Sequence, residues 1–293
     1  MKYTLKNEFY TVTLSDLGAE IVSIKSKDGF EFMWSGMKGK NYWSMSAPIL
    51  FPVCGSLPSS RYTLSGKEYE MPQHGFALSS VFELLSKSDT HIEFLLKSSE
   101  ESKKRYPFDF NFKLKYTLLG EKLVFNTSVE NLSGETMPYM FGWHPGFNLP
   151  TDEKCDIESF KLALGRESVS WIPLTDGVFY TEKPVLRELP NGEYGFNEKE
   201  IYENDTMIFK GHDKSFSLYA NESSYRLNMT ASENLPTLCI WKEPDSKAKF
   251  ICIEPWSEWG FDDKNNGNFD VRKMPRLAPG GKDEYEITLE LKI

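Results

Sequence analysis

The alternation of apolar and polar side chains over many short stretches limits what this chain can fold into. Residues 110–118 carry an aromatic residue or leucine at every even position and a polar residue at every odd one. Successive side chains of a β-strand point to opposite faces, so this period of two predicts a half-buried strand. Residues 119–121 then turn the chain, and the alternation in residues 123–129 predicts the return strand of a hairpin.

The same pattern recurs along the chain, in residues 10–14, 21–25, 91–96, 215–220, 225–229 and 284–291. Helical patterns are few, and residues 100–105 predict a single turn. Short strands separated by turn residues predict an all-β fold, a large antiparallel β-sandwich. No repeat of 20–50 residues argues for a propeller or solenoid, and no linker divides the chain. We therefore expect one domain over residues 1–293.

Charge and local composition exclude several partners. The 293 residues carry a net charge of −9, which repels nucleic acid and anionic membrane surfaces. The most apolar stretch, residues 47–54, is too short and too interrupted by proline to span a bilayer. The first ten residues, MKYTLKNEFY, contain no secretory apolar run. We expect a cytoplasmic protein, a monomer or a homodimer, whose partner is a small molecule.

Cysteine and histidine spacing argues against a metal centre. The cysteines at 54, 155, 239 and 252 show no CxxC spacing and fit buried thiols in a reducing compartment. His91 lies in an alternating strand and His212 in a polar turn, so both are interpreted as structural or solvated. The chain also lacks the glycine-rich nucleotide motifs, HExxH and GxSxG. We expect no cofactor and no metal.

His144 lies in the aromatic, glycine-rich segment 140–148, Met-Phe-Gly-Trp-His-Pro-Gly-Phe-Asn. Pro145 disfavours helical backbone at His144 and holds it extended. Gly142 and Gly146 allow a close approach of backbone to a ligand, and the aromatic rings offer flat faces to the C–H side of a sugar. Two interpretations stay open: a buried loop histidine bonded to backbone, or a histidine that performs chemistry.

Glu254 ends an apolar stretch, residues 250–253, and is followed by Pro255 and Trp256. A carboxylate is costly to bury unless it is paired or functional. Either it is a strand-end carboxylate in solvent, or it partners His144 as an acid–base pair that works near neutral pH. Glycosidase chemistry is a further alternative, which would need a second carboxylate near the first. The nearby carboxylates are Glu258, Asp262 and Asp263, but their segment, residues 256–263, is typical of a polar loop.

Several segments together resemble the aldose 1-epimerase (galactose mutarotase-like) family, in its shorter bacterial branch related to LacX proteins. The matching pieces occur in the family's order, almost from end to end: residues 47–52, 73–77, 106–110, 142–147, 204–209, 252–256 and 277–281. The resemblance implies a β-supersandwich that interconverts the α and β anomers of free aldoses without a cofactor.

The resemblance also implies roles for individual residues. Glu254 matches the general base that takes the anomeric hydroxyl proton, and His144 matches the general acid that protonates the ring oxygen. His74, in the segment Gln-His-Gly-Phe-Ala, matches the family's other active-site histidine. Asp205 matches a position that binds sugar hydroxyls. The remaining residues expected to line the pocket are Trp143 and Trp256.

Two departures from the family's pattern bear on the substrate. The family commonly has arginine where this chain has Ser56, and again where it has Leu78. Arg61 lies nearby in sequence and is the candidate replacement that would bind substrate. Loss of fixed cationic donors disfavours a sugar phosphate. The alternatives to a mutarotase of neutral sugars are a non-catalytic sugar-binding or regulatory protein and a hexose-6-phosphate mutarotase.

Overall fold

The computed structural model describes residues 1–35, 42–153, 155–175, 180–181, 183–204, 206–243, 248–259 and 267–293. Strands dominate, as the alternation predicts, and the predicted helical turn forms as α1 (Glu100–Lys103). Ser99 caps it by accepting from the Ser102 backbone N–H. The other helix is α2 (Lys199–Asn204), and four single 3₁₀ turns cover Pro58–Ser60, Ala77–Ser79, Ile157–Ser159 and Pro190–Gly192.

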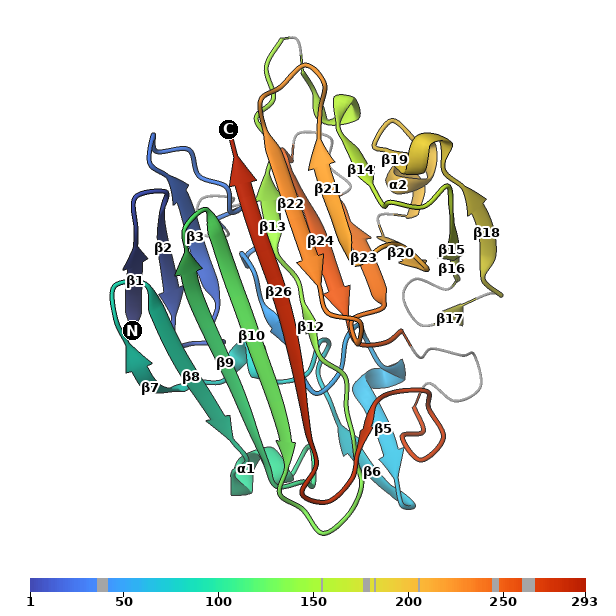
Figure 1. The fold of residues 1–293 in the computed structure, drawn as a ribbon. Coiled ribbons are helices and arrows are strands. Elements are labelled where there is room, and N and C mark those ends of the chain that lie inside the picture. The colour runs from blue at the N-terminus through green and yellow to red at the C-terminus, as the bar shows by residue number, and fades with distance from the viewer. Residues whose placement is uncertain are drawn as a thin grey trace.

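A nine-stranded antiparallel sheet forms one layer (Figure 1). In spatial order its strands are β19 (Glu193–Gly195), β14 (Lys161–Ala163), β21 (Ser215–Tyr219), β22 (Arg226–Ala231), β26 (Lys282–Lys292), β10 (Lys122–Asn131), β9 (Phe110–Leu119), β8 (His91–Lys97) and β7 (Glu83–Lys87). The predicted hairpin is β9–β10, which turns between Leu119 and Lys122. Its alternating side chains bury one face against the second layer.

An eight-stranded sheet packs behind it and carries the candidate site. Its strands are β18 (Val185–Glu188), β15 (Ser168–Ile172), β20 (Thr206–Lys210), β23 (Thr237–Trp241), β24 (Phe250–Trp256), β12 (Gly142–Trp143) and β4 (Ile49–Leu50), with β13 (Gly146–Asn148) also paired to β24. The sheets meet through aromatic contacts, such as Phe125 of β10 against Trp143 of β12, with ring centroids 5.6 Å apart.

Smaller sheets complete the fold: β1 (Lys2–Lys6), β2 (Tyr10–Ser15) and β3 (Ile21–Ser26); β5 (Arg61–Leu64) and β6 (Lys67–Glu70); β11 (Met137–Pro138) and β25 (Arg276–Leu277); β16 (Leu174–Thr175) and β17 (Tyr180–Thr181). Within the described ranges, no helix is long and apolar enough to cross a membrane.

Strand β24 is buried on both faces, which is why its sequence is almost continuously apolar. Ile251 and Ile253 join the core between the sheets. Phe250 and Cys252, on the opposite face, join a second cluster formed with tryptophans. Glu254 belongs to this second face, because side chains two residues apart in a strand point the same way. An aromatic layer therefore covers the outer face of the eight-stranded sheet, and Glu254 lies beneath it.

Candidate active site

Strand register places His144 directly across from Glu254. Two pairs fix this position: Gly142 with Trp256, and Gly146 with Cys252. Halfway between these pairs, residue 144 opposes residue 254. Directly opposed residues of antiparallel strands project to the same face of the sheet, so the two side chains meet although they come from distant parts of the chain.

The imidazole Nε2 of His144 lies 3.2 Å from Oε1 of Glu254. Both side chains are deeply buried, with 9% and 1% of their surface exposed. Among the described residues, no group is aligned to hydrogen-bond either oxygen of Glu254 or Nδ1 of His144. Buried polar groups normally find such partners. These groups face the cavity, where a bound ligand can supply well-aligned hydrogen bonds.

Burial favours the neutral form of both groups. It raises the pKa of Glu254 well above the usual range of a carboxyl, and the Trp256 and Cys239 side chains lower it by less. Burial, together with the neighbouring His74, lowers the pKa of His144 well below that of a free histidine. Both shifts favour a neutral carboxyl beside a neutral imidazole, a state in which the pair carries one proton. A carboxylate with an imidazolium carries the same number of protons, so a shift across the contact interconverts the two states.

His74 lies against this pair from a turn between β6 and the 3₁₀ turn at Ala77. Its φ is +62°, in the left-handed region, and its Nδ1 accepts a hydrogen bond of 3.1 Å from the Gly55 N–H. Its ring meets His144 edge-on, with centroids 5.4 Å apart. Burial lowers its pKa to about 4, so it is neutral at pH 7. With Nδ1 accepting, the proton of the neutral ring is assigned to Nε2.

Gly75 is required by the turn that carries His74. Its φ is +78°, and a Cβ at this position would lie 2.1 Å from the carbonyl oxygen of Phe51. The same oxygen accepts hydrogen bonds from the backbone N–H groups of Phe76 and Ala77. The glycine therefore lets this turn pack directly onto the chain at Phe51, which fixes His74 beside His144.

Aromatic rings form the walls of the cavity above the pair. Trp43 stacks on His144, with centroids 4.8 Å apart and planes inclined by 26°. Trp256 stacks on Trp259 at 5.2 Å. The cavity measures about 360 Å³, and its lining residues are Trp43, Met45, Gly55, Gln73, His74, His144, Thr206, Trp241, Glu254, Trp256 and Trp259. This described lining contains no lysine or arginine.

The segment that carries Trp43 is anchored by Glu20. Its Oε1 accepts hydrogen bonds from the backbone N–H groups of Ser46 and Ala47, at 2.7 and 2.8 Å. The His144 backbone N–H in turn donates to the Pro48 carbonyl at 3.0 Å. Glu20 thus positions both an aromatic wall and the backbone of His144.

The structure separates the residues that the sequence assigned to one site. His74, His144, Glu254 and Trp256 line the cavity together. Trp143 does not, because it is fully buried between the sheets against Phe125. Asp205 lies outside the described residues.

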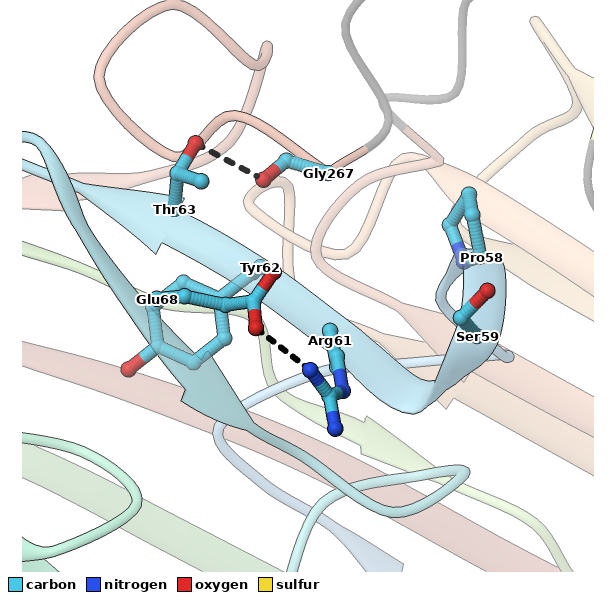
Figure 2. A pocket seen from close by; sticks show the side chains of 7 residues that line it. All are labelled: Pro58, Ser59, Arg61, Tyr62, Thr63, Glu68 and Gly267. Atoms are coloured by element: carbon cyan, nitrogen blue, oxygen red, sulfur yellow. Dashed lines mark hydrogen bonds and ion pairs between the residues drawn. The ribbon is translucent and has the colours of Figure 1, made fainter.

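Arg61 lines a different depression, on the β5–β6 hairpin (Figure 2). Its guanidinium Nη1 lies 2.5 Å from Oε1 of Glu68, and Nη2 lies 3.5 Å from Glu70. It therefore does not replace the family's arginines at the cavity. Buried Arg272, which donates to the Met140 sulfur at 3.6 Å, does not line the cavity either.

Sequence reasoning missed Trp43, Trp241, Trp259, Gln73 and Thr206. Trp241 reaches the cavity because β23 pairs with β24 in a register that opposes Trp241 to Cys252 on the face of Glu254, and this register is visible only in the structure. Gln73 and Thr206 are sequence neighbours of His74 and Asp205, which the resemblance did identify. Trp43 comes from an irregular segment and carries no pattern that indicates its position.

The two-layered antiparallel sandwich, with an imidazole–carboxylate pair beneath an aromatic cavity, defines a galactose mutarotase-like protein. The chain belongs to the aldose 1-epimerase family, whose sequence model matches residues 1–288. This agrees with the resemblance expected from the sequence.

Individual relatives match over nearly the whole chain. The chromosomal LacX protein of Lactococcus lactis subsp. lactis is 30% identical over 310 aligned positions, which cover 99% of each protein. A galactose mutarotase related enzyme from Lactobacillus acidophilus is 33% identical with a TM-score of 0.90, covering 99% of this chain and 97% of its own. A galactose mutarotase-like protein from Lactobacillus casei shares the fold, with 24% identity and a TM-score of 0.88. The match covers 99% of this chain and 100% of the Lactobacillus casei protein.

Proposed function

We propose that this protein is an aldose 1-epimerase that interconverts the α and β anomers of a free, neutral aldohexose. The observation that carries the proposal is the contact of 3.2 Å between His144 and Glu254 at the base of an aromatic cavity. Acid–base help at two oxygen atoms is what anomerisation needs, and no cofactor takes part. The aromatic walls suit the apolar face of a sugar ring.

In the proposed reaction the carboxylate of Glu254 accepts the proton of the anomeric hydroxyl, while the imidazolium of His144 protonates the ring oxygen. The bond between C1 and the ring oxygen breaks, and the open aldehyde forms. Rotation about the C1–C2 bond exposes the other face of the carbonyl, and closure reverses both proton transfers. Sugar hydroxyls that hydrogen-bond to the carboxylate favour its charged form and so shift the shared proton onto His144.

His74 is proposed to hold the sugar as a neutral donor. Its Nδ1 is occupied by the Gly55 N–H, which leaves Nε2–H available for a sugar oxygen. The edge-on contact with His144 keeps this donor next to the acid–base pair. Asp205 stays a predicted ligand of sugar hydroxyls, and Thr206 beside it lines the cavity.

Polarimetry of freshly dissolved α-glucose and α-galactose tests the proposal. The wild-type protein should accelerate the approach to anomeric equilibrium over buffer alone. Glu254→Gln and His144→Ala should each slow it by about 10²–10⁴-fold, the usual contribution of general acid–base catalysis. His91→Ala changes a histidine of β8 that lies outside the cavity, and should keep the wild-type rate. Wild-type rates equal to buffer for every aldose tested would refute the proposal.

A non-catalytic sugar-binding role is the second candidate, and the uncharged residues Ser56 and Leu78 favour it. It predicts saturable quenching of tryptophan fluorescence by a sugar with no change in the anomerisation rate. Because four tryptophans line the cavity, fluorescence reports binding directly. Measuring both quantities on one sample separates the two candidates.

A further inference from the structure

A third metal-ligating side chain lies beside the acid–base pair. The thiol of Cys252, Nε2 or Nδ1 of His144 and a carboxylate oxygen of Glu254 all lie within 4.8 Å of one another, and all three residues are buried. We propose that these three residues form a binding site for a thiophilic divalent cation such as Zn²⁺, and that the bound cation blocks the proposed acid–base pair.

Sheet geometry brings the three ligands together. Cys252 and Glu254 are two residues apart in β24 and therefore project to the same face. His144 enters from the adjacent strand, between the pairs that Gly142 and Gly146 make with β24. The set is thus held by backbone hydrogen bonds of two neighbouring strands, which is the rigid support that a metal site requires.

The spacing is close to that of a zinc site. Bonds of about 2.0–2.3 Å in a tetrahedron place the ligand atoms about 3.3–3.8 Å apart. The His144–Glu254 separation of 3.2 Å lies just below this range. The widest separation in the set needs to close by about 1 Å, which small rotations of the side chains supply. Three protein ligands leave the fourth position open toward the cavity, where water completes the tetrahedron.

The buried carboxyl of Glu254 makes the site receptive to a cation. In the described part of the chain, neither oxygen of Glu254 has an aligned hydrogen-bond donor, although its side chain is only 1% exposed. A cation is a stronger partner for these oxygens than the Trp256 and Cys239 side chains, which act on the carboxyl without a well-aligned hydrogen bond. On binding, the metal takes the lone pairs of imidazole nitrogen, thiolate sulfur and carboxylate oxygen. The thiol proton, and the proton held by the pair, pass to the buffer.

The ligand set selects the class of metal. Thiolate and imidazole favour Zn²⁺, Cd²⁺ or Co²⁺, whereas Mg²⁺ and Ca²⁺ prefer sites made only of oxygen. A cation here occupies both groups that the proposed anomerisation uses, so its binding and catalysis exclude one another. The inhibition part of the inference therefore rests on the proposed function, whereas metal binding does not.

Titration of the full chain with Co²⁺ tests the site directly. The protein is stripped with a chelator and kept in a reductant that does not bind metals. Wild type should bind one Co²⁺ with a near-ultraviolet thiolate-to-cobalt charge-transfer band, which added Zn²⁺ displaces. Cys252→Ser should lose the band and weaken Zn²⁺ binding by about 100-fold or more, since even changes outside the ligand shell cost 10–100-fold. Mg²⁺ should have no effect.

Two further variants serve as controls for the cobalt titration. Cys155→Ser removes a buried thiol whose charged neighbours are Asp152, Glu222 and Asp156 rather than the cavity residues, and should bind Co²⁺ like wild type. Cys252→Ala replaces Cys252→Ser if the latter does not fold. Cobalt binding without the charge-transfer band, unchanged Zn²⁺ affinity in the Cys252 variant, or no binding by wild type would each overturn the site.

Anomerisation then tests inhibition. Zn²⁺ should abolish the wild-type rate, whereas the same Zn²⁺ concentration should slow Cys252→Ser much less, each rate being compared with the metal-free rate of the same variant. Wild-type activity that persists with the site saturated overturns the inhibition. If wild type shows no anomerisation without metal, the proposed function fails, and the cobalt spectrum still decides the metal site.

Discussion

Nε2 of His144 and Oε1 of Glu254 lie 3.2 Å apart in a place where burial disfavours the charged form of each group. The directions of the two pKa shifts are opposite, upward for the carboxyl and downward for the imidazole. They widen the pH range over which the pair holds one proton. That single-proton state is the one from which one group can donate while the other accepts.

The pH profile should therefore show a broad plateau through neutrality. Acid adds a second proton to the pair only below the ordinary range of histidine, because burial lowers the pKa of His144. Base removes the shared proton only above the ordinary range of a carboxyl, because burial raises the pKa of Glu254. Rates should be measured with a chelator present and corrected for buffer catalysis. A narrow optimum centred near pH 5 would contradict the shared-proton description.

Glu254→Gln should stabilise the protein at neutral pH while removing activity. The folded-state pKa of Glu254 is raised above its unfolded value. The contribution of Glu254 to folding stability is therefore fully present below its pKa in the unfolded chain. It is lost as the pH rises through its pKa in the folded protein. Gln has no charge to bury, so its advantage should grow from pH 5 to pH 8 and reach about 0.5–2 kcal/mol.

Denaturant unfolding of wild type and Glu254→Gln at these two pH values checks this. Glu258→Gln is a matched control, since Glu258 is already paired with Lys210 and Lys273 and should not show the same gain. A Glu254→Gln protein that is less stable than wild type at pH 8 would show that other contacts of the carboxylate outweigh the cost of burial.

Gly75→Ala should destabilise the fold by about 3 kcal/mol or more, because it combines a positive φ with a backbone clash. The added Cβ would lie 2.1 Å from the Phe51 carbonyl oxygen. Gly120→Ala is the matched control: its φ is +58°, with nothing within 4 Å of the added Cβ, and it should cost about 1 kcal/mol. Chemical denaturation measures both, and equal losses would mean that the contact at Phe51 relaxes freely.

Trp143→Phe and Trp256→Phe should behave in opposite ways. Trp143 is packed between the sheets, so its truncation should lower unfolding free energy by about 1–3 kcal/mol and leave sugar affinity intact. Trp256 lines the cavity, so its loss should weaken sugar binding more than stability. Unfolding curves and sugar titrations on both variants check this. The assignment of Trp256 to the cavity and Trp143 to the core would be wrong if Trp143→Phe weakened sugar binding and Trp256→Phe did not.

Glucose should be preferred over glucose 6-phosphate. A phosphate needs fixed cationic donors, and the cavity lining that the structure describes includes neither lysine nor arginine. Arg61, the candidate replacement, is instead paired with Glu68 on another face. Rates of anomerisation for the two substrates, compared at equal concentration and low salt, test this. A higher rate with the phosphate would indicate a cationic contact from residues outside the described part.

Local sequence patterns predicted part of the fold and could have predicted part of the site. Alternation predicted the β9–β10 hairpin and the all-β class, because period two follows from strand geometry alone. The same rule could have separated Trp143 from His144: adjacent strand residues face opposite sides, so Trp143 points into the core when His144 points into the cavity. It also explains why Trp256, two residues after Glu254, shares its face.

By itself the sequence determined the class of fold, the family and the candidate residues His74, His144 and Glu254, because these depend on short segments and their order. Only the tertiary structure decided which of the residues meet. The contact between His144 and Glu254 comes from the register of β12 and β13 against β24. Cys252 joins them through the same register, and Trp43 comes from an irregular segment anchored by Glu20. Register depends on pairing between distant strands, and local side-chain patterns do not encode it.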